Sequence, residues 1–356
     1  MNLTAPSDPR AFGHVFTDHM AVITYADRRW DELRIAPHEP ISLAPAASGL
    51  HYGQVIFEGL KAYRQPDGDV ALFRIRDHAR RFQASALHMA MPPLPVEQFV
   101  DACVRLVTID EAFVPSEPGH SLYLRPLMLA TTARLGVQPA TEYLCVIIAS
   151  PVGAYLSART RAWTIMAERA QVRAAPGGTG AAKCAGNYGA SLAARAHASG
   201  GDYDELLFLD ATEHRWVEEL SAMNVFIVEA GDGAVPALVT PLTGGTILAG
   251  VTRASLLELA PTLGYRVREA PIAIDDWQRR AATGEISEAF ASGTGAVVAP
   301  IGRVLDGHTA WTIGDGTPGP VTRRLRGALL DLQEGRAPDH YRWRVPLRLR
   351  RTRSYD

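Results

Sequence analysis

Residues 177–189 read GGTGAAKCAGNYG, where a single lysine, Lys183, stands among small residues. The nearest familiar pattern is the phosphate loop of ATP-binding proteins, G-x-x-x-x-G-K-[ST]. Gly177 could begin that pattern, but Ala182 replaces its second glycine and Cys184 replaces the hydroxyl residue that binds magnesium. Two of the four fixed positions fail, so the ATP interpretation is set aside. The small residues would instead allow a large, flat group to approach the lysine closely.

The composition limits the kinds of protein that this chain can be. It has 356 residues, 47% of them hydrophobic, which is enough for one large or two ordinary domains with a substantial core. The net charge of −2 gives no reason to expect a nucleic-acid partner. Three cysteines without metal spacing fit a reducing compartment, and we find neither a signal peptide nor a membrane-spanning stretch. We therefore expect a cytoplasmic protein with no metal site and no membrane partner.

Apolar periodicity predicts a mixed α/β fold without internal repeats. Three short apolar runs are typical of strands: 143–150, 205–210 and 224–230. Apolar residues at helical spacing predict three helices: 78–93, 190–201 with a stop at Gly200 and Gly201, and 320–335.

The segment after residue 150 lies between two strand-rich halves and marks a domain boundary. We expect four parts: a small N-terminal domain at 1–150, an interdomain loop at 151–164, a larger domain at 165–343 and a basic extension at 344–356. Six arginines from Arg342 to Arg353 indicate a solvated extension or a contact within a dimer, with an acidic interaction partner as the alternative.

A neutral lysine can form a Schiff base with an aldehyde, and pyridoxal 5'-phosphate is the commonest aldehyde cofactor. Such a site needs an acid facing the pyridine nitrogen, a donor at the ring hydroxyl and a cradle for the phosphate. The sequence offers candidates for all of these: Lys183, the pair Glu218 and Glu219, Tyr188, and the predicted helix start at Gly250, Val251 and Thr252. Each also has a plain explanation, as a solvated lysine, a solvated acidic pair or an ordinary helix start, and ASGTGAVV (291–298) could be only a tight turn.

Eight ordered segments make the chain resemble the branched-chain amino-acid aminotransferases. The segments are FTDHM (16–20), LHYGQVIFEGLKAYR (50–64), YLRPLMLAT (123–131), SPVGAY (150–155), VRAAPGGTGAAKCAGNYGASL (172–192), VEELSAMN (217–224), GTILAGVTR (245–253) and SGTGAVV (292–298). The resemblance implies a two-domain pyridoxal-phosphate enzyme of fold type IV. It also implies that the larger domain has a barrel-like sheet and that the active site lies between the domains.

The same resemblance implies the roles of the cofactor-binding residues. Lys183 would hold the cofactor and later move a proton between the substrate's α-carbon and the cofactor. Glu219 would keep the pyridine nitrogen protonated, and Tyr188 would bind the ring hydroxyl. Four residues would bind the phosphate: Arg81, Val251, Thr252 and Thr294. Arg80, beside Arg81, is taken as a surface residue.

The substrate-binding residues are likewise implied by the resemblance. The turn at Thr294 and Gly295 would bind the α-carboxylate, and Arg125 would pair with the distal carboxylate of glutamate. Arg125 lies two residues after Tyr123, so the two face the same side of a predicted strand; a structural salt bridge is the plain alternative for Arg125. An apolar pocket would be formed by Phe57, Tyr123 and Tyr155, with Tyr52 and Val137 reaching in from the second subunit of a homodimer. Ordinary core packing is the plain alternative for each.

The implied activity is transamination of leucine, isoleucine and valine with 2-oxoglutarate, which gives branched 2-oxo acids and glutamate. Three stretches depart from the family's usual sequence: LSA at 220–222, LAG at 248–250 and SGTGA at 292–296. They remove no catalytic group but leave the side-chain preference open. The alternatives are a specialised biosynthetic aminotransferase, a lyase or D-amino-acid aminotransferase of the same fold, and a binding protein that has lost activity. FEGLKAY, YLRP and the intact set of cofactor residues argue against the last two.

Overall fold

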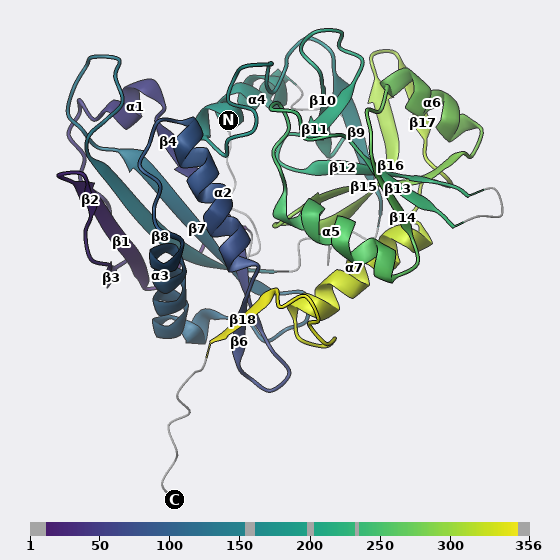
Figure 1. The fold of residues 1–356 in the computed structure, drawn as a ribbon. Coiled ribbons are helices and arrows are strands. Elements are labelled where there is room, and N and C mark those ends of the chain that lie inside the picture. The colour runs from purple at the N-terminus through teal and green to yellow at the C-terminus, as the bar shows by residue number, and fades with distance from the viewer. Residues whose placement is uncertain (1–11, 154–160, 198–202, 232–234, 348–356) are drawn as a thin grey trace, which may run out of the picture. The chain divides into compact units, whose positions relative to one another are not determined.

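The computed structural model describes residues 12–153, 161–197, 203–231 and 235–347 of the chain (Figure 1). The chain divides into two compact units, residues 1–157 together with 331–356, and residues 158–330. Each unit contains helices and one sheet of nine described strands. The expected mixed α/β class is therefore confirmed.

The sheet of the first unit is antiparallel throughout its described pairs, in the order β18-β6-β5-β7-β8-β1-β2, with β3 beside β1 and β4 beside β7. Its strands are β1 (His19–Ala26), β2 (Arg29–Trp30), β3 (Arg34–Pro37), β4 (Val55–Phe57), β5 (Leu60–Arg64), β6 (Val70–Phe73), β7 (Ser121–Ala130), β8 (Tyr143–Val152) and β18 (Arg344–Leu347). Helices α2 (Ile75–His88) and α3 (Val96–Ile109) pack on each other and on strands of this sheet (Figure 1). Two short elements complete the unit: α1 (Ser48–Tyr52) and the 3-10 helix η1 (Glu111–Phe113).

The sheet of the second unit closes on itself. Its order is β11-β10-β9-β16-β15-β12-β13-β14, and β11 also pairs with β12, so the strands from β11 to β12 form a ring. A closed ring removes the exposed edges along which other strands could add. The strands are β9 (Trp163–Glu168), β10 (Glu205–Leu209), β11 (Val217–Leu220), β12 (Asn224–Glu229), β13 (Ala237–Thr240), β14 (Arg266–Glu269), β15 (Ile286–Gly293), β16 (Val297–Asp306) and β17 (Thr309–Thr312).

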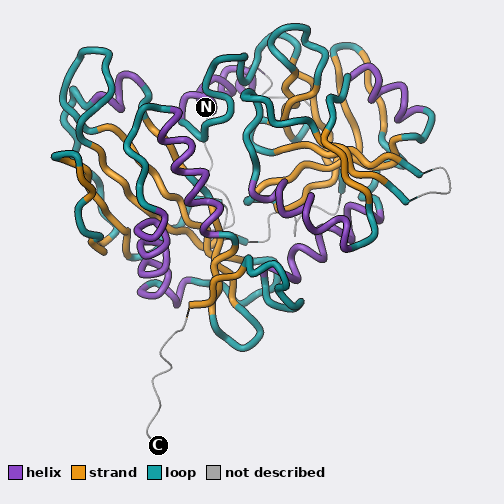
Figure 2. Tube along the Cα trace, in the orientation of Figure 1, coloured by secondary structure: helices purple, strands orange, loops and turns teal. Residues whose placement is uncertain are grey.

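Helices surround the strands of the second unit (Figure 2). They are α4 (Ala185–His197), α5 (Val251–Thr262), α6 (Ile274–Ala282) and α7 (Pro320–Gln333). Both α5 and α6 contact β15. Helix α7 begins beside the buried carboxylate of Glu288, which accepts hydrogen bonds from the N–H groups of Val321 (2.9 Å) and Thr322 (2.8 Å). A carboxylate at this position satisfies N–H groups that have no partner within the helix.

The elements predicted from apolar periodicity are confirmed where the structure describes them. The three predicted strands are β8, β10 and β12, and two of the predicted helices are α2 and α7. In α2, Phe82 and Ala86 are buried on one face, as their spacing requires. The third predicted helix is α4, which begins at Ala185, before the expected start. Its predicted stop at Gly200 and Gly201 lies outside the described residues.

The C-terminal region differs from the sequence-based expectation. Residues 344–347, assigned there to a solvated extension, form strand β18 and pair antiparallel with β6. Residues 331–343, assigned to the larger domain, group with the first unit. Hydrogen bonds hold them there: the N–H of Arg74 donates to the carbonyl of Trp343 (2.7 Å), and Gln65 donates to that of Gln333 (3.2 Å). The rest of the arginine-rich tail, 348–356, lies outside the described residues.

Among the helices that the structure describes, none is both long enough and apolar enough to cross a membrane.

Candidate active site

The loop that carries Lys183 and leads into α4, here called the lysine loop, is held in shape by Asn187 in the first turn of that helix. Its amide nitrogen donates to the carbonyls of Thr179 and Ala182, each at 2.8 Å, and its amide oxygen accepts from the Thr179 hydroxyl at 2.7 Å. Gly180 lies close to the loop around Thr246, between β13 and α5, here called the 246 loop. A Cβ at Gly180 would be 2.5 Å from the Thr246 carbonyl oxygen. The small residues around Lys183 therefore serve, at least at Gly180, to let two loops touch.

Lys183 and Tyr188, both assigned to the cofactor by the family resemblance, lie in contact. The Lys183 Nζ lies 2.8 Å from the Tyr188 hydroxyl oxygen, and both side chains are half-buried. The chain has one other lysine, Lys61, which is buried within β5 of the first unit. A lysine amine that is half-buried and hydrogen-bonded to a phenol is suited to exchanging protons.

Glu219 lies at the seam where the ring of strands closes, since it pairs in register with Asn224 of β12. The side chain is almost completely buried. One oxygen, Oε1, accepts from the N–H of Leu248 at 2.9 Å and forms an ion pair with Nη2 of Arg173 at 2.7 Å. Burial raises the pKa of Glu219 from 4.5 to about 7, against the opposing effects of Arg173, the Leu248 N–H and Lys183.

Glu218, the other member of the acidic pair, is also buried, so the plain expectation of two solvated carboxylates is wrong. Burial raises the pKa of Glu218, and a hydrogen bond with Thr246 and the charge of Arg173 oppose that rise. Arg173 pairs directly with Glu219, at 2.7 Å.

Arg173 is the residue of this site that sequence reasoning missed. Its guanidinium is buried, donates to the carbonyls of Gly180 (2.9 Å) and Thr246, and forms an ion pair with Glu219. It belongs to the quoted VRAAPGG stretch, but nothing in the sequence pairs it with an acid that far along the chain. Only the meeting of three separate segments reveals the ion pair.

The predicted phosphate-binding residues of the second unit lie at backbone positions suited to an anion. Helix α5 begins at Val251 after Gly250, and its N-cap residue makes no side-chain hydrogen bond to the first turn. The first N–H groups of a helix lack partners within the helix, and they suit a phosphate. Gly250 has to be glycine because a Cβ there would collide with the side-chain oxygen of Asn224. Thr294 and Gly295 form the turn between β15 and β16, as expected.

Arg81 lies on α2 in the first unit and is bound to a buried carboxylate. Its Nε and Nη2 donate to the two oxygens of Glu58, at 2.6 and 2.8 Å, and the Nδ1 of His78 lies 2.8 Å from Glu58. Burial alone would raise the pKa of Glu58, but Arg81 and His78 hold it well below its usual range. Arg80, in contrast, is largely exposed and pairs with Asp77. Sequence reasoning selected Arg81 but missed Glu58, although FEG was among the quoted segments.

Three predicted substrate residues gather on the first unit. Arg125 donates to the hydroxyl of Tyr123 at 3.0 Å, and its guanidinium lies 4.8 Å from the ring centre of Phe57. The Nε of Arg125 is buried and has no hydrogen-bond partner among the described residues. A third aromatic residue, Phe12, packs edge-on against Tyr123 with ring centres 4.8 Å apart. Phe12 was not predicted, because no local pattern marks it.

The remaining predicted substrate residues behave differently. Tyr52, at the end of α1, is exposed, and its hydroxyl donates to the carbonyl of Leu135. Val137 is 81% exposed, so it is not packed in the core of its own unit. Tyr155 lies outside the described residues.

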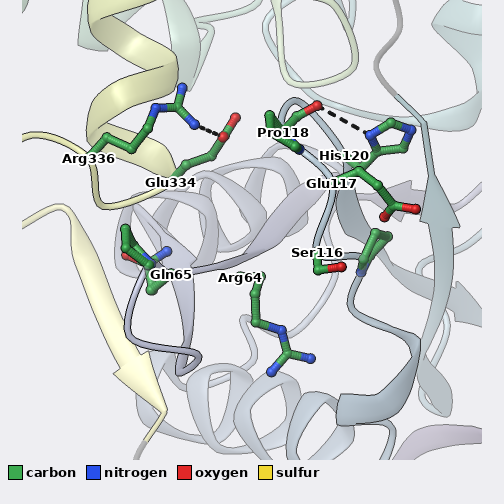
Figure 3. Close-up of a pocket in the computed structure, with 10 residues that line it drawn as sticks. Arg64, Gln65, Ser116, Glu117, Pro118, His120, Glu334 and Arg336 are labelled. Carbon is green, nitrogen blue, oxygen red and sulfur yellow. Dashed lines mark hydrogen bonds and ion pairs between the residues drawn. The ribbon is translucent and has the colours of Figure 1, made fainter.

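A separate cavity of about 130 Å³ in the first unit contains none of the predicted residues (Figure 3). Its cationic side chains are already bound: Arg336 pairs with Asp331 and Glu334, and Arg64 pairs with Glu111. His120 lies 3.3 Å from the carbonyl oxygen of Pro118. We assign this cavity no ligand, because its arginines are used in holding the loop and C-terminal segments together.

Comparison with known proteins agrees with this geometry. The sequence matches the amino-transferase class IV family over residues 55–304. It is 48% identical over 334 residues to a probable branched-chain-amino-acid aminotransferase of Streptomyces coelicolor, covering 93% of this chain and 91% of that protein. It is 46% identical to the branched-chain-amino-acid aminotransferase of Mycobacterium tuberculosis, covering 94% and 92%. The chain therefore belongs to the class IV aminotransferases.

A solved structure resembles the whole chain as well. It is a branched-chain amino acid aminotransferase from the organism abbreviated T.th., determined with pyridoxamine 5'-phosphate. It matches with a TM-score of 0.72 and 30% identity over 91% of this chain and 98% of that one. The expected fold type IV is confirmed by this match.

Proposed function

We propose that this protein transfers the amino group of leucine, isoleucine or valine to 2-oxoglutarate, with pyridoxal 5'-phosphate as cofactor. The observation that carries the proposal is the Lys183–Tyr188 pair beside a buried, ion-paired Glu219, in a chain whose relatives over more than nine-tenths of its length are named for this activity. The products are branched 2-oxo acids and glutamate.

The residues of the second unit fit the cofactor. Pyridoxal phosphate supplies an aldehyde that takes up an amino group and a ring that accepts the electron pair left on the α-carbon. Lys183 provides the amine and, when released, a base that carries the α-proton. Tyr188 lies within hydrogen-bond distance of that amine and is suited to the ring hydroxyl. Glu219 is suited to the ring nitrogen, and the phosphate fits the first turn of α5 at Val251 and Thr252 together with Thr294.

The first unit contains the other residues to which the family resemblance assigns roles. Arg81 supplies a cation for the phosphate, with Glu58 holding its orientation. Phe57, Tyr123 and Phe12 supply apolar surface for a branched side chain, and Arg125 supplies a cation for the second carboxylate of glutamate. The exposed Tyr52 and Val137, with Tyr155, would complete the pocket in a homodimer. The three free, buried cysteines fit a cytoplasmic protein.

The chain offers a clean test, because it has only two lysines. We expect the purified protein loaded with pyridoxal phosphate to transaminate leucine with 2-oxoglutarate and not D-alanine. Borohydride reduction of the loaded protein should attach the cofactor to Lys183, as read by peptide mass spectrometry. Lys183→Ala should lose turnover by several powers of ten and should not be labelled.

The matched control is Lys61→Arg, which keeps the charge at the other lysine and should retain both labelling and turnover. Labelling of Lys61, or near wild-type turnover by Lys183→Ala, would overturn the proposal.

A further inference from the structure

We propose that Arg173 is a positioning residue that favours the ionised form of Glu219 and holds it in place to bind the ring nitrogen of the cofactor. The inference rests on the proposed function and extends it to a residue that the family resemblance did not assign a role. Arg173 is placed to act through Glu219, with which it forms a buried ion pair at 2.7 Å.

Three segments of the second unit meet at the Arg173 guanidinium. It donates to the carbonyl of Gly180, which belongs to the lysine loop, and to that of Thr246, which precedes α5. Its third partner is Glu219, at the seam of the barrel. All three contacts involve the same terminal nitrogen, Nη2: the two carbonyls accept its hydrogen bonds, and the Glu219 carboxylate contacts it as an ion pair.

Glu219 needs a nearby cation to stay charged. A carboxylate that is almost fully buried tends to take up a proton unless it is paired. The charged groups that act on it are Arg173 and Lys183, which favour ionisation, and Glu218, which opposes it. Lys183 must give up its charge to attack an aldehyde or to act as a base. During turnover, Arg173 is therefore the cation on which the charge of Glu219 depends.

The two oxygens of Glu219 have different contacts. Oε1 accepts from the Leu248 N–H and forms the ion pair with Arg173. Among the described residues, Oε2 makes a long contact, 3.4 Å, with the amide nitrogen of Asn224. Oε2 is therefore the oxygen better suited to accept the ring N–H. A carboxylate that kept no negative charge could not hold the ring nitrogen protonated.

The test replaces Arg173 and reads the ring nitrogen directly. Wild type, Arg173→Gln and Arg173→Lys are loaded with pyridoxal phosphate labelled with ¹⁵N in the ring, and the ¹⁵N resonance reports whether that nitrogen is protonated. We expect a protonated ring in wild type, loss of that proton in Arg173→Gln and partial rescue in Arg173→Lys. The value of kcat for leucine should fall roughly 10- to 100-fold in Arg173→Gln, since removing a neighbouring cation raises the pKa of a carboxyl by about 1–3 units.

The matched control is Arg253→Lys. Arg253 is equally buried and also binds a carboxylate, that of Glu269, and a loop carbonyl, that of Pro241. Its replacement should lower stability without moving the ¹⁵N resonance. A ring nitrogen that stays protonated in Arg173→Gln, or that shifts equally in Arg253→Lys, would overturn the inference.

Arg173→Gln alone leaves the buried Glu219 without its ion-pair partner and could fold poorly. A double variant avoids this problem, because it removes both charges. Arg173→Gln/Glu219→Gln should match Glu219→Gln in ¹⁵N resonance and in kcat, since Arg173 acts through Glu219. A further loss in the double variant would assign Arg173 a separate role and overturn the inference. Failure of wild type to bind the cofactor or to transaminate would instead count against the proposed function.

Discussion

At the scale of single residues, the site depends on groups whose ionisation is shifted by burial. Glu219 is the clearest example, because burial brings its pKa from 4.5 to about 7. In protein lacking the cofactor, this shift makes stability depend on pH. Between pH 4.5 and 7 the folded state binds a proton that the unfolded state has lost, so the free energy of unfolding should fall as pH rises through this range.

We expect Glu219 to account for a decrease of about 3 kcal/mol over that window, from the size of the pKa change. Urea unfolding of the cofactor-free protein at a series of pH values measures it. Glu219→Gln has no proton to exchange and should remove that part of the slope. An identical pH dependence in both proteins would show that Glu219 is not held at a raised pKa.

The sequence alone identifies some of these site residues and misses others. Lys183, Tyr188 and Glu219 were found because each sits in a short, specific motif. Arg173 and Glu58 were not assigned roles, although both lie in quoted segments, because their importance comes from ion pairs with Glu219 and Arg81. Such pairs join residues that are tens of positions apart, and a single sequence contains no signal of that kind.

At the scale of elements, the contact between the lysine loop and the 246 loop gives a paired glycine prediction. Gly180→Ala would place a Cβ 2.5 Å from the carbonyl oxygen of Thr246 and 2.6 Å from the Cβ of Ala174, so the loops must separate. We expect it to weaken cofactor binding at least tenfold, as backbone displacement at a packed contact costs about 1–3 kcal/mol. Fluorescence titration of cofactor-free protein with pyridoxal phosphate measures this.

The control is Gly186→Ala, in the first turns of α4, where a Cβ meets nothing within 4 Å. Alanine is the better helix former, so this variant should bind the cofactor normally and gain up to about 1 kcal/mol in stability. Equal binding losses in the two variants would mean that the loop contact does not matter.

Strand β7 carries a second prediction at this scale, because it presents Arg125 and Tyr123 together. No carboxylate pairs with Arg125 among the described residues, which favours a substrate role over a structural salt bridge. Arg125→Leu should weaken the glutamate half-reaction by about 1.5–3 kcal/mol. The leucine half-reaction should stay within about tenfold of wild type.

Single-turnover kinetics with each amino acid distinguish these outcomes, with Tyr123→Phe as the control that removes only the hydroxyl bonded to Arg125. Equal losses for both amino acids in Arg125→Leu would indicate a structural role.

Elements with a clear apolar period were predictable, and those made by distant pairing were not. Helix α7 was found because Val321, Leu325, Leu329 and Leu332 share one face and are all buried. Strand β18 was missed because RVPL is short, contains a proline and lies in an arginine-rich stretch, and its partner β6 lies more than 250 residues earlier. Closure of the barrel through β11 and β12 likewise depends on tertiary pairing.

At the scale of the whole molecule, exposed apolar side chains gather on two segments of the first unit. Leu50 and Tyr52 on α1 and Leu135 and Val137 in the loop after β7 are between 41% and 81% exposed. Tyr52 joins these two segments through its hydrogen bond to the Leu135 carbonyl. A cluster of this kind is costly in water and is typical of a protein interface. It includes both residues that the family resemblance assigns to the partner's pocket.

We therefore expect Val137→Asp to shift a homodimer toward monomer, because burying a carboxylate at the interface without a partner is unfavourable. Losing the apolar contact alone costs about 1.5–3 kcal/mol, so the dimer dissociation constant should rise roughly tenfold or more. Activity with leucine should fall in parallel, since Tyr52 and Val137 would no longer complete the neighbouring pocket. Sedimentation velocity and turnover, measured at the same protein concentrations, test both parts.

Ile109→Asp, on the similarly exposed end of α3, is the control and should change neither. A wild-type monomer with full activity, or a Val137→Asp monomer that keeps it, would show that each chain carries a complete site.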